Sequence, residues 1–337
     1  MTEGPPGLDL GQLAEWLPGV IPGAGKDLRA GLIAGGKSNL TYELTDGAST
    51  WILRRPPLGH VLATAHDMTR EYRVMSALKN TPVPVPEMYG LCEDTGVLGV
   101  PFYLMERVEG TPYRQAAQLE PLGPERTRAI AVSMVDTLAA LHQVDPAAVG
   151  LEGFGKPEGF LARQVGRWKK QLDASYCRDL PAADELHKRL AGDIPDQSKP
   201  GIVHGDYRLD NILVGDDDRL NAVIDWEMAT LGDPLTDLAL MIVYQRRGVD
   251  SVANVSSAPG FPSEREIIER YAAGSDRDMS RFGFYLGLAC YKLAVILEGI
   301  HYRYLHGQTV GSGFETIGQS IPPLLESGLA ALKEYNS

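Results

Sequence analysis

Two kinds of residue are scarce in this chain of 337 residues, and each scarcity excludes a class of protein. Cysteine occurs three times, at distant positions and without a C-x-x-C pair, so neither a disulfide framework nor a zinc site is indicated. Basic residues number 32 against 44 acidic ones, which gives a formal net charge of −12. This balance makes nucleic acid an unexpected partner.

Targeting and membrane-spanning signals are also lacking. The N-terminal segment has an acidic residue, Glu3, where a signal peptide needs basic ones, and no apolar stretch follows, so we expect a cytoplasmic protein. The most membrane-like segment, residues 282–300, contains Lys292 and Glu298. Charged side chains are costly inside a bilayer, so we expect a buried core helix and no membrane partner.

The pattern of hydrophobic residues changes near residue 107 and predicts two lobes, residues 1–107 and 108–337. The first lobe reads as short strands with one helix, at residues 64–78. Its strands are expected at residues 28–33, 41–44, 50–54, 88–92 and 102–107. The second lobe reads as long helices around a loop, hairpin and loop at 202–235. Its helices are expected at residues 124–142, 160–174, 182–190, 237–245, 263–273, 279–306 and 314–335.

Residues 31–38 match the Walker A pattern G-x-x-x-x-G-K-[ST]. A P-loop opens a helix, whereas the residues that follow here alternate in polarity and predict a strand. The segment is therefore interpreted as a glycine-rich flap between two strands, whose backbone amides fold over nucleotide phosphates. A true P-loop and a plain hairpin turn stay as alternatives.

Residues 203–226 carry the most informative pattern, His204-Gly-Asp206 followed by Asn211 and by Asp225. Two apolar runs around an acidic turn predict a hairpin in which Asn211 and Asp225 face each other. Opposed residues have Cα atoms about 4.5–5.5 Å apart, so an amide oxygen and a carboxylate could share one Mg²⁺ ion. His204 is expected to be structural, and Asp210 a solvated turn residue.

Asp206 precedes Asn211 by five residues and lies in a loop, so its carboxylate can project toward the same site without being a ligand. In phosphoryl transfer to an alcohol, such an aspartate accepts the hydroxyl proton while the metal neutralises charge on the phosphates. We interpret Asp206 as this base.

These motifs, with Ile224-Asp225-Trp226, resemble the aminoglycoside phosphotransferase superfamily of protein-kinase-like enzymes. Residues 51–57, 102–110 and 232–239 resemble the phosphotransferase domain associated with acyl-CoA dehydrogenases. The resemblance covers residues 28 to 335. It implies an α+β, protein-kinase-like two-lobe fold, with a small antiparallel-sheet N-lobe carrying one main helix and a larger, mostly helical C-lobe.

The resemblance also implies roles for individual residues. Asp206 would be the catalytic base, Asn211 and Asp225 the magnesium ligands, and Glu71 the partner of the basic residue on the third strand. That basic residue is Arg54 where kinases have lysine, and its fixed charge and planar donors differ in reach. The phosphate flap would comprise Gly35, Gly36, Lys37 and Ser38.

Further implied roles concern the adenine pocket and the catalytic loop. The backbone of residues 105–108, with Glu106 and Val108, would read the adenine edge. Asp237 would hold the amides of the catalytic loop. The apolar walls of the pocket would be Ile33, Leu53, Leu213 and Ile224.

The implied reaction is ATP- and Mg²⁺-dependent transfer of the γ-phosphoryl group to a hydroxyl of a small molecule. The subgroup implies a hydroxyacyl-CoA, whereas the superfamily name implies an aminoglycoside or another small alcohol. A nucleotide-binding pseudokinase stays as an alternative of a different class, because Arg54 replaces the lysine. The basic residues around Trp168 could meet coenzyme A phosphates or form a solvated helix face; they are Arg163, Arg167, Lys169 and Lys170. The sequence gives no indication of the oligomeric state.

Overall fold

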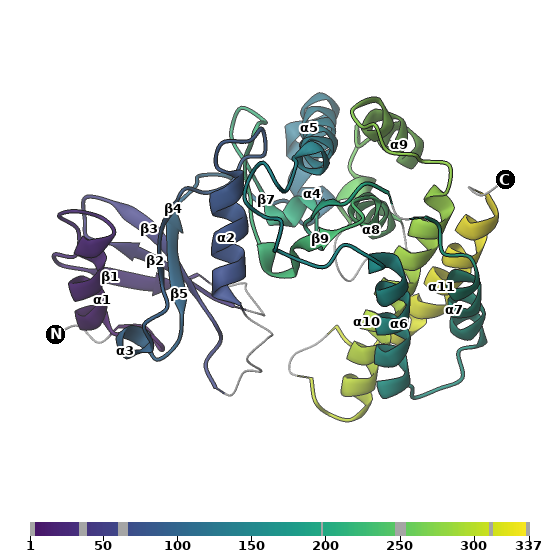
Figure 1. Ribbon diagram of the computed structural model, residues 1–337, viewed down its shortest axis with the longest axis horizontal. Helices are drawn as coiled ribbons and strands as arrows, with labels where there is room; N and C mark the ends of the chain where they lie inside the picture. Colours follow the sequence, from purple (N-terminus) through teal and green to yellow (C-terminus); the bar gives the residue numbers. More distant parts are fainter. Residues whose placement is uncertain are drawn as a thin grey trace. The chain divides into compact units, whose positions relative to one another are not determined.

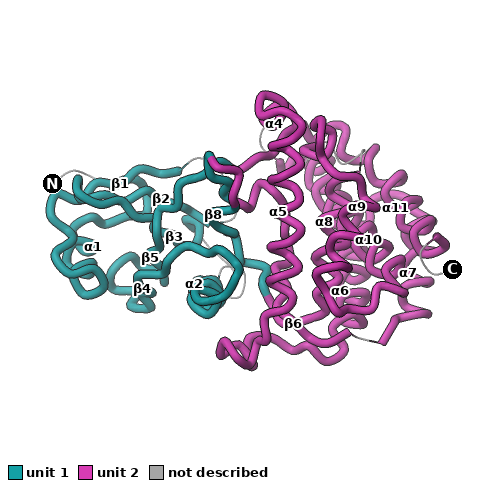
Figure 2. Tube along the Cα trace, turned by 90° about the horizontal axis from the view of Figure 1, so that it is seen from above, with its two compact units in different colours: residues 1–111, 213–216, 220–229 teal, residues 112–212, 217–219, 230–337 magenta. Residues whose placement is uncertain are grey.

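The computed structural model describes residues 4–33, 39–59, 67–196, 198–246, 254–309 and 313–334 (Figure 1). The fold is α+β, as predicted, with an antiparallel sheet followed by a mostly helical part. The chain divides into two compact units (Figure 2). The sheet unit comprises residues 1–111, 213–216 and 220–229, and the helical unit comprises residues 112–212, 217–219 and 230–337.

Five antiparallel strands form the sheet in the order β1-β2-β3-β5-β4, and all five were predicted. They are β1 (Arg29–Leu32), β2 (Leu40–Thr45), β3 (Thr50–Arg55), β4 (Met88–Cys92) and β5 (Phe102–Glu106). The main helix, α2 (Met68–Leu78), begins after Asp67, whose carboxylate accepts a hydrogen bond from the Arg70 N–H at 3.1 Å. The strand β2 after the glycine-rich segment contradicts a P-loop, which would open a helix there.

The sheet unit also contains two short helices that the sequence did not predict, α1 (Leu10–Trp16) and α3 (Thr95–Leu98). Asp9 caps α1 by accepting hydrogen bonds from the N–H groups of Gly11 and Gln12. With seven residues between proline- and glycine-rich segments, α1 is too short to show helical periodicity.

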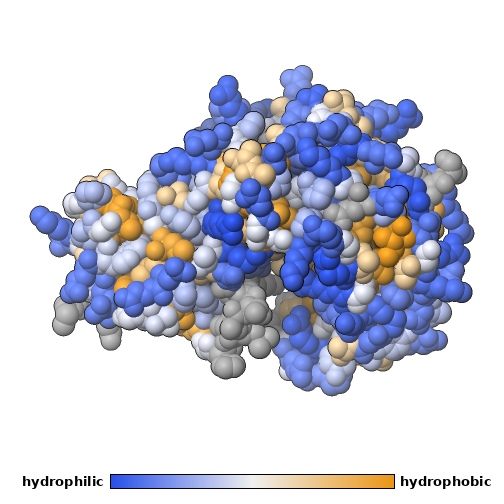
Figure 3. Space-filling view, in the orientation of Figure 1, coloured by the Kyte–Doolittle hydropathy of each residue, from blue (hydrophilic) through white to orange (hydrophobic). Residues whose placement is uncertain are grey.

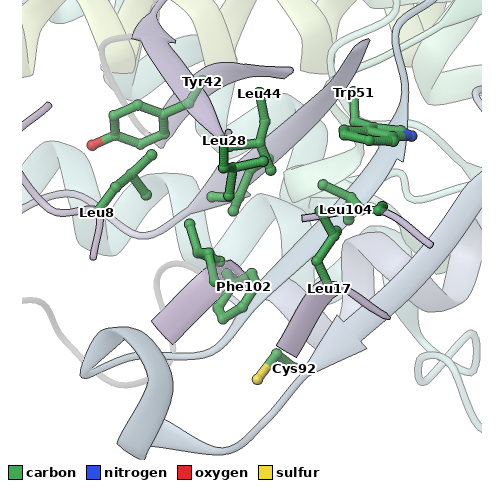
Figure 4. Close-up of a cluster of buried hydrophobic side chains, with 12 residues drawn as sticks. Leu8, Leu17, Leu28, Tyr42, Leu44, Trp51, Cys92, Phe102 and Leu104 are labelled. Atoms are coloured by element: carbon green, nitrogen blue, oxygen red, sulfur yellow. The ribbon is translucent and has the colours of Figure 1, made fainter. Parts of the chain in front are cut away.

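Helices α1 and α2 lie on opposite faces of the sheet (Figure 1). Side chains alternate along strands, so Leu53 joins Leu13 and Leu17 in the core beneath α1, part of which Figure 4 shows. Arg54 and Tyr103 are on the α2 face. The prediction of Leu53 as a nucleotide-pocket wall beside Arg54 is therefore wrong, since neighbouring strand residues point to opposite faces.

The predicted hairpin is present, as β7 (Ile212–Val214) and β8 (Leu220–Val223) form a two-stranded sheet. The expected opposition of Asn211 and Asp225 within paired strands is not observed. Asn211 ends the 3-10 turn η3 (Leu209–Asn211) before β7, and Asp225 adopts a left-handed conformation, with φ 66°, after β8. Both therefore lie outside the ladder that would oppose them.

The helical unit contains the predicted long helices and an unpredicted antiparallel strand pair, β6 (Gly201–Val203) with β9 (Thr230–Gly232). Its helices are α4 (Ala116–Leu119), α5 (Pro124–Gln143), α6 (Phe160–Ala174), α7 (Pro181–Gly192), α8 (Leu235–Gln245), α9 (Glu264–Ala273), α10 (Phe282–Leu305) and α11 (Ile317–Glu334).

Helix α10 is long and apolar enough to cross a membrane, yet 78% of its most apolar stretch is buried inside the protein. It packs against α6, α7, α8 and α11 of its own unit. On the face of each unit that Figure 3 presents, hydrophilic side chains predominate over scattered apolar patches. The interpretation of α10 as a core helix agrees with this burial.

Candidate active site

Arg54 and Glu71 form the ion pair that the sequence predicted. Both side chains are buried, and the Arg54 Nε lies 3.4 Å from the Glu71 Oε2. The same guanidinium donates from Nη2 to the Oδ1 of Asp225 at 2.5 Å. The planar arginine fork thus joins two carboxylates, one on α2 and one after β8, where a lysine would present a single point charge.

Two further donors hold the Glu71 carboxylate. The Asn39 amide donates to Oε1 and the Tyr103 hydroxyl donates to Oε2, each at 2.8 Å. The Asn39 amide also lies 3.3 Å from the Oε2 of Glu227. Sequence reasoning did not assign a role to Asn39 or to Tyr103, although Tyr103 lies in the segment 102–110, because only the tertiary fold brings their side chains to Glu71.

Burial raises the pKa of Glu71 to about 7, against the opposing effects of Arg54 and the Tyr103 hydrogen bond. Since the ordinary value is 4.5, the folded state binds more protons than the unfolded state between pH 4.5 and 7. The contribution of Glu71 to the free energy of unfolding is therefore full below pH 4.5 and is lost as the pH rises through 7.

We expect Glu71→Gln to remove this pH dependence. Across that window, the stability of the wild type relative to Glu71→Gln should decrease by up to about 3 kcal/mol as the pH rises. Denaturant unfolding of both proteins from pH 4.5 to 8 measures the difference. A constant difference would show that Glu71 is ionised throughout and would contradict the prediction.

Asp225 is held in the sheet unit by its own pair with Arg54 and by the contacts of its neighbours. The Val223 N–H donates to the carbonyl of Pro84 at 2.8 Å, and Arg70 of α2 donates to the carbonyl of Ala229 at 3.0 Å. Among the described residues, the Oδ2 of Asp225 accepts no hydrogen bond. This oxygen is therefore free to bind a cation.

Of the residues predicted to contact the nucleotide, the structure describes Glu106 and Val108 but not the glycine-rich flap. Gly35, Gly36, Lys37 and Ser38 lie outside the described residues. Glu106 ends β5, and its N–H donates to the Glu87 carbonyl at 2.8 Å while its side chain accepts from the Glu87 N–H at 3.0 Å. The N–H of Glu106 is thus already engaged, whereas the backbone of Val108 makes no hydrogen bond to the rest of the described chain.

In the helical unit, Asp237 in the first turn of α8 holds the loop that begins at His204 by hydrogen bonds to its backbone. The buried Asp237 carboxylate accepts hydrogen bonds from the N–H groups of His204 at 2.6 Å and Gly205 at 2.8 Å. Burial acts to raise the pKa of Asp237, but His142 and the loop amide hold it below the usual value. This geometry matches the supporting contact implied for Asp237.

His204 is fully buried, as expected for a structural histidine. Its Nδ1 accepts a hydrogen bond from the Asp206 N–H at 3.2 Å, which places the ring proton on Nε2. The histidine thereby helps to set the direction of the backbone at Asp206.

Each carboxylate oxygen of Asp206 accepts a hydrogen bond. The Tyr244 hydroxyl of α8 donates to Oδ1 at 3.0 Å, and the Asn211 amide donates to Oδ2 at 3.1 Å. The Asn211 amide also lies 2.9 Å from the carbonyl of Asp206. The Asp206 side chain is 30% exposed, so its carboxylate is oriented by the protein and still accessible from solvent.

The prediction that Asp210 is a solvated turn residue is wrong. Asp210 is buried, and both of its oxygens accept hydrogen bonds from the guanidinium of Arg208. That guanidinium also lies 5.0 Å from the centre of the Tyr244 ring. A buried charge requires a partner, and Arg208, two residues away, supplies it within the loop.

The structure brings the predicted site residues together in two groups. Arg54, Glu71 and Asp225 meet in the sheet unit, and Asp206 meets Asn211 in the helical unit. Sequence reasoning missed Tyr244 of α8 and Lys292 of α10, which contact Asp206 and Gly205 of the loop. No local motif marks them, because their partners lie 38 and 87 residues away.

The donor atoms suit Mg²⁺. The side-chain nitrogen of Asn211 donates hydrogen bonds to Asp206. The side-chain oxygen of Asn211 accepts no hydrogen bond from a described residue, so it can serve as a metal ligand. Asp225 has the free Oδ2. No cluster of three or more His, Cys, Asp or Glu side chains that could hold a metal occurs among the described residues. Each of the two oxygens, taken within its own unit, is of the kind that Mg²⁺ binds together with substrate phosphates and water.

Comparison with known proteins identifies the family. Residues 30–281, well over half of the chain, match the model of the phosphotransferase enzyme family. Acyl-CoA dehydrogenase family member 11 of Gallus gallus is 36% identical over 343 residues, which cover 97% of this chain and 44% of that protein. The Homo sapiens protein of the same name is 37% identical, over 88% of this chain and 39% of that protein. The chain thus spans less than half the length of these relatives.

Solved structures agree with the fold. A crystal structure from Ralstonia eutropha JMP134, provisionally described as an aminoglycoside phosphotransferase, is 34% identical with a TM-score of 0.85 and covers 98% of this chain and 99% of that one. A thermostable mutant of aminoglycoside phosphotransferase APH(4)-Ia, in complex with ADP and hygromycin B, is 17% identical with a TM-score of 0.57, over 90% and 93% of the two chains. At that identity the likeness concerns the fold alone. The chain therefore belongs to the phosphotransferase enzyme family, the family of the aminoglycoside phosphotransferases.

Proposed function

We propose that this protein is an ATP- and Mg²⁺-dependent phosphotransferase that moves the γ-phosphoryl group to a hydroxyl of a small molecule. The observation that carries the proposal is the loop around Asp206. Its amides are anchored on Asp237, and its carboxylate is oriented by Tyr244 and Asn211 yet 30% exposed. Such a loop suits phosphoryl transfer, in which positioning matters more than basicity.

In this proposal Asp206 accepts the proton of the acceptor hydroxyl as the hydroxyl oxygen bonds to the γ-phosphorus and the bond to the ADP leaving oxygen breaks. Asn211 and Asp225 would hold Mg²⁺, which neutralises negative charge on the phosphates when bound. Arg54, oriented by Glu71, would contact the α- and β-phosphates, and residues 35–38 would cover them. ADP in the complex of the APH(4)-Ia mutant supports an adenine nucleotide as donor.

For the acceptor we propose a hydroxyacyl-CoA thioester. The support is the sequence identity with acyl-CoA dehydrogenase family member 11. The matched part makes up 44% of the Gallus gallus protein and 39% of the Homo sapiens protein, so more than half of each relative lies outside the match. An aminoglycoside is the competing acceptor, supported by hygromycin B in the complex of the APH(4)-Ia mutant.

The test is an acceptor screen in which ADP formation is followed with hydroxyacyl-CoA thioesters and aminoglycosides side by side. We expect ADP formation that requires both Mg²⁺ and a hydroxylated acceptor, with a preference for the thioesters. An ATP analogue could bind in a Mg²⁺-dependent manner while no acceptor raises ADP formation above the rate measured without acceptor. In that case the protein is a nucleotide-binding module without this activity.

A further inference from the structure

Two cationic side chains from different helices meet the same aromatic ring in the helical unit. The Arg167 guanidinium carbon of α6 lies 5.4 Å from the centre of the Trp168 ring, and the Lys292 Nζ of α10 lies 5.7 Å from it. Both distances are within the range of cation–π attraction. We call Arg167, Trp168 and Lys292 the Trp168 cluster.

Neither cation of the Trp168 cluster lies within ion-pair distance of a carboxylate among the described residues. Neighbouring cations of α6 differ: Lys169 pairs with Asp173, and Arg163 donates to the carbonyls of Lys156 and Glu158. Arg167, in contrast, is exposed and has no ion-pair partner in the part of the chain that the structure describes. Of the basic residues that the sequence singled out on α6, Arg167 is thus one that remains available to a ligand.

The Trp168 cluster adjoins the proposed catalytic loop. Lys292 donates to the carbonyl of Gly205 at 3.0 Å, and Gly205 directly precedes Asp206. Burial lowers the pKa of Lys292, an effect that the negative charges of Asp206 and Asp237 oppose and the positive charge of Arg167 reinforces. The ammonium group has three donors and the described protein accepts one hydrogen bond from it, so two remain for a ligand.

We propose that Arg167 and Lys292 bind an anionic group of the acceptor, a phosphate or a carboxylate. This inference rests on the proposed function and narrows its acceptor class. Two neighbouring cations that lack an ion-pair contact with a carboxylate repel each other, and an anion that binds both relieves the repulsion through charge-assisted hydrogen bonds. The same charges repel a polycationic aminoglycoside, so the cluster favours an acyl-CoA or a free hydroxy acid.

The experiment varies the charge on the acceptor while its hydroxyacyl group stays the same. Three acceptors carry that group: the coenzyme A thioester, the free hydroxy acid, and the neutral N-acetylcysteamine thioester. We expect Arg167→Ala and Lys292→Gln each to raise KM for a charged acceptor about tenfold or more and to leave KM for the neutral thioester unchanged. Glutamine keeps an N–H donor but is one atom shorter than lysine, so an unchanged kcat of Lys292→Gln with the neutral thioester checks that the loop at Gly205 keeps its geometry.

Lys188→Ala, which removes an exposed cation of α7, is the matched control and should change no KM. A rise in KM for the coenzyme A thioester alone shows that the cluster binds the phosphates of coenzyme A. A rise in KM for the free acid shows that it binds a carboxylate. Either result supports the inference. Equal KM changes for charged and neutral acceptors, or none, overturn it.

Failure of the proposed function is recognised separately. If the wild type phosphorylates no acceptor, titration calorimetry with coenzyme A alone tests the Trp168 cluster. Weaker binding by Arg167→Ala than by Lys188→Ala then supports an anion site in a protein of another activity. Equal binding by the two variants contradicts it.

Discussion

Asp206→Ala should lower kcat by about 10²–10⁴-fold while the affinity for ATP stays nearly unchanged. The variant removes the group that accepts the hydroxyl proton, and it leaves the candidate metal ligands in place. The loop should persist, since the Asn211 amide still donates to the carbonyl of residue 206 and Asp237 still accepts from the amides of His204 and Gly205.

Steady-state turnover with the best acceptor, combined with calorimetric binding of an ATP analogue, measures both quantities. Asp217→Ala is the control, because it removes an exposed aspartate from the turn of the β7–β8 hairpin. A kcat within tenfold of the wild type would remove Asp206 from the role of base and with it the proposed chemistry.

Asp225→Asn should abolish turnover and the Mg²⁺-dependent gain in nucleotide affinity together. The substitution removes the charge that attracts the metal. It keeps the shape of the side chain and an oxygen for Arg54, and asparagine tolerates the left-handed backbone of this position, with φ 66°. Loss of binding should therefore reflect the missing charge and not a refolded segment.

The measurement is the affinity for an ATP analogue with and without Mg²⁺. Asp218→Asn is a closely matched control, because Asp218 is also left-handed, with φ 64°, and pairs with an arginine, Arg126. We expect Asp218→Asn to behave as the wild type. Retention of the Mg²⁺ effect in Asp225→Asn would exclude Asp225 as a metal ligand.

Local patterns predicted the elements well where they were long or strongly alternating. The five strands of the sheet and the helices from α5 to α11 follow from the periodicity of their hydrophobic residues. Helix α1 was missed since its seven residues bury one leucine, Leu13, within the helix. Leu53 was assigned to the wrong face because the strand pattern is apolar on both sides, so alternation could not distinguish the faces.

Motif spacing predicted which residues of the site matter, and the structure added how they are held. The pair of Arg54 with Glu71 was predicted, but the second partner of Arg54, Asp225, lies 171 residues further along the chain. The burial of Asp210 was not predicted, because a loop aspartate and a buried one have the same local sequence. The presence of Arg208 two residues before Asp210 could have suggested a buried ion pair.

The sequence by itself determined the family, the five strands of the sheet and the long helices in their order along the chain, and the candidate base and ligands, because short motifs and hydrophobic periodicity are local properties of the chain. Tertiary structure alone decided that Tyr244 orients Asp206, that Asn39 and Tyr103 hold Glu71, and that Arg167 and Lys292 meet at Trp168. These contacts join side chains on separate elements. Their geometry depends on how strands pair and helices pack, which no local pattern encodes.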